Sequence, residues 1–204
     1  MRKLIASTFV SLDGVMQAPG MPTEDPSGGF TLGGWLFAFM DADLDLSETG
    51  LDGSHRELVL GRRTYEIFEA FWPHQSKDDP TAKSLIAAKK HVASRSLKSL
   101  QWNNSSVLEG DVASAITALK AKPGLDLQII GSSNLIQSLQ AASLIDEYIV
   151  LTYPVVLGSG KRLFENGARP GALRLVTSKV SKTGVVMSTY LPAGEIVLGT
   201  VGQA

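Results

Sequence analysis

Short apolar runs alternate with amphipathic segments over the first three quarters of the chain. The apolar runs have the length and composition of buried strands, which we predict over residues 4–12, 58–60, 91–94, 106–109, 127–130 and 147–152. The amphipathic segments repeat apolar residues at helical spacing and predict helices over residues 34–46, 64–71, 78–89, 112–119 and 133–142. After residue 150 two strands, 174–179 and 184–191, follow each other and predict a hairpin around residues 182–184.

This order of elements predicts a single α/β domain over residues 1–204, folded as a three-layer α/β/α sandwich. Strands that alternate with helices form a mainly parallel sheet, and the final two strands predict an antiparallel C-terminal edge. A chain of 204 residues is long enough to bury the core of such a domain. Ligands of open parallel sheets bind beyond the carboxyl ends of the strands, so we expect the binding site at that edge.

Two of the predicted strands end at a glycine that leads directly into a predicted helix. The first junction is Gly61-Arg62-Arg63-Thr64 and the second is Gly131-Ser132-Ser133. Such junctions place free backbone N–H groups at a helix N-terminus, where phosphate binds, and the two guanidinium groups add positive charge. Two junctions of this kind in one chain suggest a ligand with several phosphates, of which a dinucleotide is the simplest.

Both junctions also have an ordinary structural interpretation. Thr64 caps its helix while Glu66 pairs with an arginine, and a serine after a turn glycine is a common N-cap. Ser94-Arg95-Ser96, after the third predicted strand, is typical either of a phosphate-binding turn or of a solvated one. Lys161-Arg162 leaves the same two alternatives open: anion binding or simple exposure.

A long connection and a group of acids follow the first predicted strand. Residues 17–34 contain three prolines and five glycines, which makes them a candidate binding loop or lid. Asp41, Asp43 and Asp45 lie near the end of the helix predicted over residues 34–46. These acids are either solvated, or one of them lies at the cleft as a proton relay.

Composition excludes several classes of function. The net charge is −1 and the lysines and arginines are scattered, so we expect no nucleic-acid partner. The chain has no cysteine, which excludes disulfides, thiolate catalysis and cysteine-ligated zinc. Its three histidines lack metal-ligand spacing, and we predict no metal site. No apolar run reaches the roughly 20 residues of a membrane span, and the N-terminus lacks a signal-peptide pattern, so we expect a cytoplasmic protein.

Six motifs, read in order, resemble the dihydrofolate reductase superfamily over nearly the whole chain. They are Ser11-Leu12-Asp13-Gly14, Leu60-Gly61-Arg62-Arg63-Thr64-Tyr65, Ser94-Arg95, Ile130-Gly131-Ser132-Ser133-Asn134-Leu135, Leu144-Ile145-Asp146-Glu147 and residues 154–164. More closely, the chain resembles the reductase domain of bacterial riboflavin-biosynthesis deaminase-reductases and its stand-alone relatives. The resemblance implies a dihydrofolate reductase-like fold, an NADPH-dependent reductase and a homodimer formed through the apolar C-terminal strands.

The resemblance also implies where NADPH is bound. The segment that holds the cofactor's phosphates matches Gly61, Arg62, Arg63 and Thr64. The glycine-rich turn under the pyrophosphate matches Gly131, Ser132 and Ser133, with Leu135 in the helix that follows. The turn at the adenosine 2′-phosphate matches Ser94 and Arg95. The region that lines the nicotinamide matches Ala6, Gly14 and Val15.

The implied reaction transfers a hydride to a C=N or C=O bond of a small heterocycle. The first expected substrate is 5-amino-6-(5-phosphoribosylamino)uracil, and the second is a pterin or folate. Asp13 and Asp41 are the candidate catalytic contacts, and Trp35 and Thr152 are candidate substrate-binding residues. Thr23 follows Met21-Pro22 where dihydrofolate reductases carry a Pro-Trp pair, which argues against folate.

One alternative belongs to a different class of protein. A non-catalytic nucleotide-binding protein keeps the cofactor cleft and loses the substrate half. The loop at residues 17–34 distinguishes the two hypotheses, because closure over a pocket lined by Trp35 and Phe39 favours an enzyme. A disordered loop and a filled pocket favour nucleotide binding alone. A third hypothesis is a structural or oligomeric protein with neither ligand, which loss of cofactor binding on replacing Arg62 and Arg63 would exclude.

Overall fold

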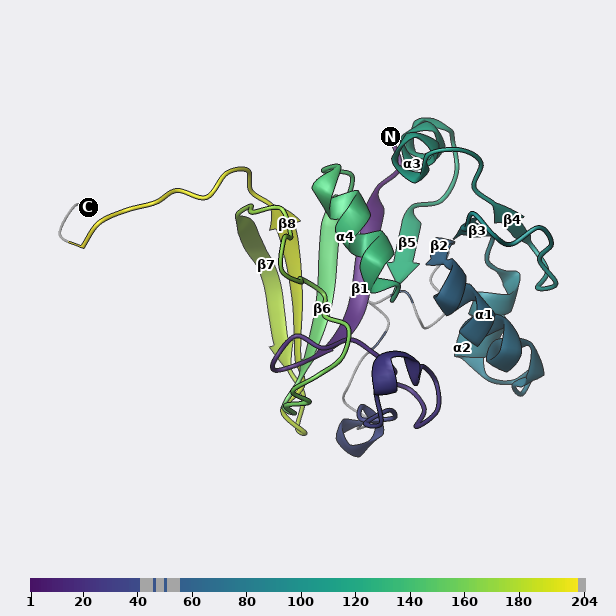
Figure 1. Cartoon of the computed structure of the whole chain (residues 1–204), viewed down its shortest axis with the longest axis horizontal. Helices are drawn as coiled ribbons and strands as arrows, with labels where there is room; N and C mark the ends of the chain where they lie inside the picture. The colour runs from purple at the N-terminus through teal and green to yellow at the C-terminus, as the bar shows by residue number, and fades with distance from the viewer. Residues whose placement is uncertain (41–45, 47–49, 51–55, 202–204) are drawn as a thin grey trace.

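A single eight-stranded sheet organises the fold (Figure 1). The structure is a computed structural model that describes residues 1–40, 46, 50 and 56–201. The strands are β1 (Leu4–Ser11), β2 (Glu57–Gly61), β3 (Lys90–Ala93), β4 (Ser105–Val107), β5 (Leu127–Ile130), β6 (Glu147–Tyr153), β7 (Leu173–Val180) and β8 (Val186–Pro192). Their order in the sheet is β4-β3-β2-β5-β1-β6-β8-β7. Strands β1 to β6 pair in parallel, whereas β8 pairs antiparallel with both β6 and β7, as the sequence predicted for the C-terminal edge.

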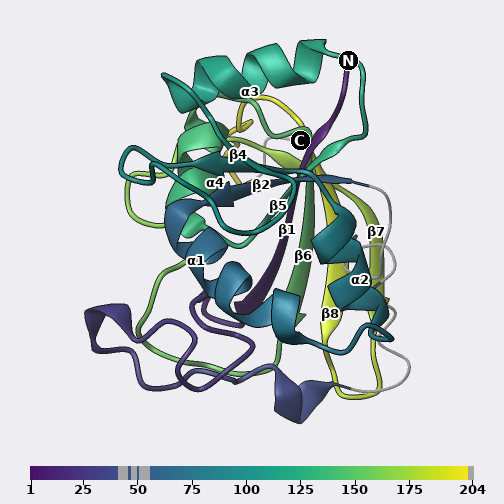
Figure 2. The same ribbon diagram turned by 90° about the vertical axis from the view of Figure 1, so that its right-hand side faces the viewer.

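Helices cover both faces of the sheet, which confirms the predicted three layers. They are α1 (Arg62–Phe71), α2 (Pro80–Ala87), α3 (Val112–Ala121) and α4 (Ser133–Ala141), with short 3-10 turns η1 (Ser27–Gly29), η2 (Phe37–Phe39) and η4 (Trp72–His74). Ile116 of α3 and Leu139 of α4 belong to the core on one face. Tyr65 of α1 and Leu85 of α2 belong to a separate core on the opposite face. Figure 2 shows α4 and α2 on opposite sides of the strands.

The helix predicted over residues 34–46 is wrong over its described part, where only the three-residue turn η2 forms. Trp35 is buried, its indole N–H donates to the Gln17 carbonyl at 2.9 Å, and its ring meets Tyr153 edge-on at 5.4 Å. Met40 has already returned to an extended conformation. The apolar residues at helical spacing therefore pack individually beneath the long loop, and this tertiary packing overrides the local pattern. Asp41, Asp43 and Asp45 lie outside the described residues.

The C-terminal edge of the sheet carries exposed apolar side chains. Strand β7 is exposed along its whole length and includes Leu175, Val176 and Val180. After β8 the chain runs away from the body of the molecule (Figure 1), and Val197 and Leu198 on this arm are almost fully exposed. No helix in the described part of the chain is long and apolar enough to cross a membrane.

Candidate functional site

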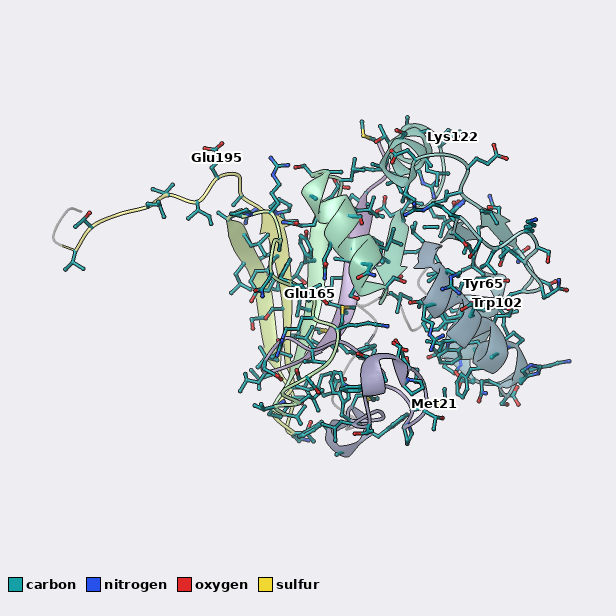
Figure 3. All side chains as sticks on the ribbon, in the orientation of Figure 1. Met21, Tyr65, Trp102, Lys122, Glu165 and Glu195 are labelled. Atoms are coloured by element: carbon teal, nitrogen blue, oxygen red, sulfur yellow. The ribbon has the colours of Figure 1, made fainter. Side chains whose placement is uncertain are left out.

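A cleft of about 550 Å³ lies at the carboxyl ends of β1, β2 and β5, the edge at which the sequence predicted a ligand. One wall comes from the loop after β1, which contributes Gln17, Met21 and Asp25. Figure 3 shows Met21 on this loop, at the end of the molecule toward which β1 runs. The remaining walls come from β1, from the segment around η2, from α1 and the residues after it up to Thr81, from residues 130–133 and from Lys161.

The two predicted phosphate junctions are joined by one side chain. The Ser132 hydroxyl accepts the Gly61 backbone N–H at 2.9 Å and donates to Thr64 Oγ1 at 2.6 Å. A Cβ atom on Gly61 would lie 2.9 Å from the Ser132 hydroxyl oxygen, so glycine is needed for this approach. Gly131 has a φ of +71° and Ser132 a φ of +62°, the left-handed conformation that turns the chain from β5 into α4. The first glycine turn (residues 61–64) and the second glycine turn (residues 131–133) thus form one unit.

Both glycine turns offer backbone donors to the cleft. Helices α1 and α4 begin at Arg62 and Ser133, and neither N-cap residue, Gly61 or Ser132, gives a side-chain hydrogen bond to the first helical turn. Ser132 is therefore the N-cap residue of α4, as the ordinary interpretation predicted, but its side chain makes no capping hydrogen bond. First-turn N–H groups without a side-chain cap, together with the positive ends of two helix dipoles, suit a pyrophosphate. The residues present thus fit the phosphate groups of a dinucleotide cofactor.

Asp25 binds the two cations of the cleft wall. Its carboxylate contacts the Arg63 guanidinium at 3.2 Å and the Lys161 ammonium at 2.5 Å. Burial alone would raise the pKa of the Asp25 carboxyl, but hydrogen bonds from Lys161 and Ser27 outweigh burial and hold the pKa below its usual value. The Gln17 side-chain amide donates to the Asp25 carbonyl at 2.9 Å and accepts the Lys161 N–H at 3.0 Å. The loop, α1 and the segment after β6 are therefore connected across the cleft by charge.

The other arginines lie elsewhere. Arg62 is exposed and pairs with Glu66 one helical turn later, at 3.0 Å, which is the ordinary interpretation of this residue. Arg95 is exposed directly after β3 and forms no ion pair with another residue in the described chain. The Ser94 hydroxyl accepts the N–H groups of Ser96 and Leu97 and closes the turn that carries Arg95. Of the three arginines, only Arg63 lines the cleft.

Asp13 has a structural environment that does not suit a catalytic acid. Its carboxylate accepts the Ser11 hydroxyl at 2.6 Å, the Leu157 N–H at 3.0 Å and the Gly158 N–H at 2.8 Å. These bonds, with Ser11 first among them, hold the pKa of Asp13 well below its usual range. The ionised carboxylate organises the turns after β1 and β6 and does not line the cleft, so Asp13 is a poor proton donor for a substrate. The other candidate, Asp41, lies outside the described residues.

Several other predicted contacts lie behind the cleft rather than on its surface. Ala6 and Val15 are fully buried, and Leu135 and Trp35 are nearly so. Thr152 pairs with Val10 and Val186 inside the sheet. Gly14 has a φ of +81° in the turn after β1. These residues shape the elements around the cleft, whereas Thr8 and Phe9 supply the surface of β1 that lines it.

Sequence reasoning missed the aromatic wall of the cleft. It consists of Phe68 and Phe71 of α1, Trp72 of η4 and Phe9 of β1. Trp72 meets Phe71 edge-on at 5.1 Å and Phe68 at 6.1 Å. The spacing of Phe68 and Phe71 on one helix was a detectable signal, but only the fold packs Phe68 and Phe9 of β1 against the same core.

The sheet order, the reversed β8 and the paired glycine turns at the carboxyl edge define a dihydrofolate reductase-like fold. The chain matches a dihydrofolate reductase from Enterococcus faecalis complexed with NADP(H), with a TM-score of 0.57, 16% identity, and coverage of 93% of this chain and 96% of that chain. It also matches a protein from Shewanella sp. PV-4, assigned provisionally to riboflavin biosynthesis, with a TM-score of 0.72, 21% identity, and coverage of 95% and 99%.

The model of the RibD C-terminal domain family matches residues 2–187, and the chain belongs to this family. Among curated proteins, YyaP of Bacillus subtilis (strain 168) is 25% identical over 193 residues, which cover 93% of this chain and 94% of YyaP. YwjB of the same organism is 28% identical over 178 residues, with coverage of 87% and 91%. The family indicates a reductase as the class of enzyme.

Removing the hydroxyl that joins the two glycine turns should destabilise the fold. In Ser132→Ala the Gly61 N–H and the Thr64 hydroxyl lose their partner, and we expect the free energy of unfolding to fall by about 1–3 kcal/mol. Urea denaturation followed by circular dichroism measures the change. The matched control is Ser138→Ala, an exposed serine of α4, with an expected change within about 0.5 kcal/mol. Equal effects of the two substitutions would contradict this role of Ser132.

Proposed function

We propose that this protein is an NADPH-dependent reductase that acts on a C=N or C=O bond of a small ring compound. The observation that carries the proposal is the pair of glycine turns, joined by Ser132, at one cleft of a chain that belongs to the RibD C-terminal domain family. A phosphorylated ribosylaminopyrimidine is the first substrate that family membership suggests, and a pterin or folate is the second.

The chain's own residues supply binding, orientation and a dry surface. When bound, NADPH supplies the hydride. The first-turn N–H groups of α1 and α4 hold its phosphates, and Ser132 keeps the two turns at a fixed separation. Phe9, Phe68 and Phe71 exclude water from the aromatic wall of the cleft. Glu24 also lines the cleft, and burial raises the pKa of its carboxyl, so this group retains a proton more readily than the ionised Asp25.

An open cleft favours an enzyme over the alternative of a nucleotide-binding protein without activity. The loop after β1 forms a wall of the cleft and does not fill it. Leu36, Phe37 and Met40 line the space, while Trp35 and Phe39 pack behind them against Tyr153. Phe37 is 63% exposed and Met40 is 40% exposed, and exposed apolar side chains on a concave surface are typical of a ligand site.

Arg95 is the residue that we propose for recognition of the 2′-phosphate of NADPH. It follows β3, the neighbour of the strand that ends at the first glycine turn, and its guanidinium is free of ion pairs in the described chain. Arg62 and Arg63 are already paired with Glu66 and Asp25. An unpaired guanidinium makes the stronger contact with a phosphate, because no existing bond has to break.

We predict that the purified protein binds NADPH more tightly than NADH by at least about tenfold, and that Arg95→Gln removes most of this difference. Separate calorimetric titrations with the two nucleotides measure both dissociation constants. Lys122→Gln, an exposed cation at the end of α3 and distant from the cleft (Figure 3), is the matched control and should leave the ratio unchanged. If neither NADPH nor NADH binds, the reductase proposal is refuted. If Arg95→Gln leaves the ratio of the two dissociation constants unchanged, only the proposed role of Arg95 is refuted.

We also propose that two copies of the chain associate through β7 and the C-terminal arm (residues 193–201). β7 is the last strand of the sheet, so its outer edge has no neighbouring strand in the described chain. The exposed Leu175 and Val176 lie on this strand, and Val197 and Leu198 on the arm are exposed as well. An arm that leaves its own body and carries apolar side chains is suited to cover the same edge of a second copy.

Sedimentation velocity tests the association. We expect the wild-type protein to sediment as a dimer, and Val176→Lys to shift the population toward monomer by placing a charge at the edge. Leu125→Lys replaces a comparably exposed apolar residue outside β7 and should remain dimeric. A wild-type monomer at every concentration would contradict the proposal.

A further inference from the structure

Apart from the glycine turns, the cleft is lined mainly by carbon. Its apolar lining includes Phe9, Leu36, Phe37, Met40, Ile67, Phe68, Phe71 and Trp72. They come from four separate elements: β1, the segment around η2, helix α1 and η4. A flat ring placed against this wall gains contact area on aromatic side chains at low cost in conformational entropy.

The cations among the described residues of the cleft are already paired with a carboxylate. Among the described residues that line it, the cations are Arg63 and Lys161, and both bind the Asp25 carboxylate. The same lining contains two further carboxyl groups, Glu24 and Asp79. A phosphate monoester on the substrate would therefore lose its hydration without gaining an unpaired cation.

The segments between residues 41 and 55 that lie outside the described residues add no lysine or arginine to the cations named above. Residues 41–45, 47–49 and 51–55 contain no lysine and no arginine. Their charged residues are acidic, and their one histidine is His55. Wherever these segments lie, they add no permanent positive charge to the apolar wall.

We propose that the substrate of this reductase is an uncharged, largely apolar ring compound with a conjugated C=O or C=N bond, and that the site rejects phosphorylated substrates. The inference rests on the proposed reductase activity and narrows its substrate: of the two substrates that family membership suggests, it excludes the phosphorylated ribosylaminopyrimidine. The hydride from reduced nicotinamide adds to the carbon of the double bond, and a proton from water adds to the oxygen or nitrogen. NADP⁺ and the reduced ring are the products. The aromatic wall orients the ring, and specificity arises from the missing partner for a phosphate.

Two probes with the same ring isolate the effect of the phosphate. 2-Naphthol and 2-naphthyl phosphate are titrated calorimetrically at pH 8 into the protein saturated with NADP⁺, so that the glycine turns are not available to the phosphate probe. We expect 2-naphthol to bind at least about tenfold more tightly, because the apolar wall offers the phosphate no cation. Equal or tighter binding of 2-naphthyl phosphate would overturn the inference.

A substitution that supplies the missing charge gives a second, independent readout. Met40 is 40% exposed on the cleft wall, so Met40→Lys adds an ammonium group there with little effect on the core. It should narrow or reverse the preference for 2-naphthol, whereas Leu125→Lys, with a comparable exposure outside the cleft, should not. An unchanged preference in Met40→Lys would count against the inference.

The two proposals fail separately. The first titration in the series, NADP⁺ alone, tests the cofactor site, and its failure refutes the reductase. In that event the naphthyl probes are titrated into the free protein with inorganic pyrophosphate in excess, so that the glycine turns are again not available to the phosphate probe. Tighter binding of 2-naphthol would then support the proposed apolar site, and tighter binding of 2-naphthyl phosphate would refute it.

Discussion

The arrangement of the candidate site depends on one hydroxyl group. Ser132 accepts the N–H of Gly61 and donates to Thr64. These bonds fix the relative positions of two strand ends, those of β2 and β5, and of the helices α1 and α4 that follow them. The contact requires glycine at 61 and a left-handed backbone at 131 and 132. Two helix N-termini are thereby held at one spacing, which suits the two adjacent phosphates of the dinucleotide that we propose.

Asp25 has the corresponding role for the loop after β1. Its carboxylate joins Arg63 of α1 to Lys161 of the segment after β6, and its carbonyl is held by Gln17. This network connects three elements that are distant in sequence, and it already engages the two cations Arg63 and Lys161. The contacts that hold the loop and the discrimination against phosphate that we propose thus have the same origin.

Most of the fold could be predicted from local patterns, because the strands are short apolar runs and the helices follow apolar spacing. The glycine turns could also be predicted, since a glycine between an apolar run and a polar helix start has few other uses. The helix over residues 34–46 could not be assessed correctly, because Trp35 and Leu36 are buried by the loop above them rather than by a helical face. The roles of Asp13 and Asp25 depend on partners more than 100 residues away, such as Gly158 and Lys161.

The sequence by itself determined the family, the class of fold and the two glycine turns, because each is encoded in contiguous residues. Tertiary structure decided which polar groups face the cleft. In the folded chain the Asp13 carboxylate accepts a backbone N–H of the turn after β6, and Arg62 pairs with Glu66 of its own helix. Arg95 forms no ion pair within the described chain. It also brought the aromatic residues of α1 and η4 into the lining of the same cleft as Phe9. The physical reason is that charge pairing and ring contact depend on distance in space, which separation along the chain does not specify.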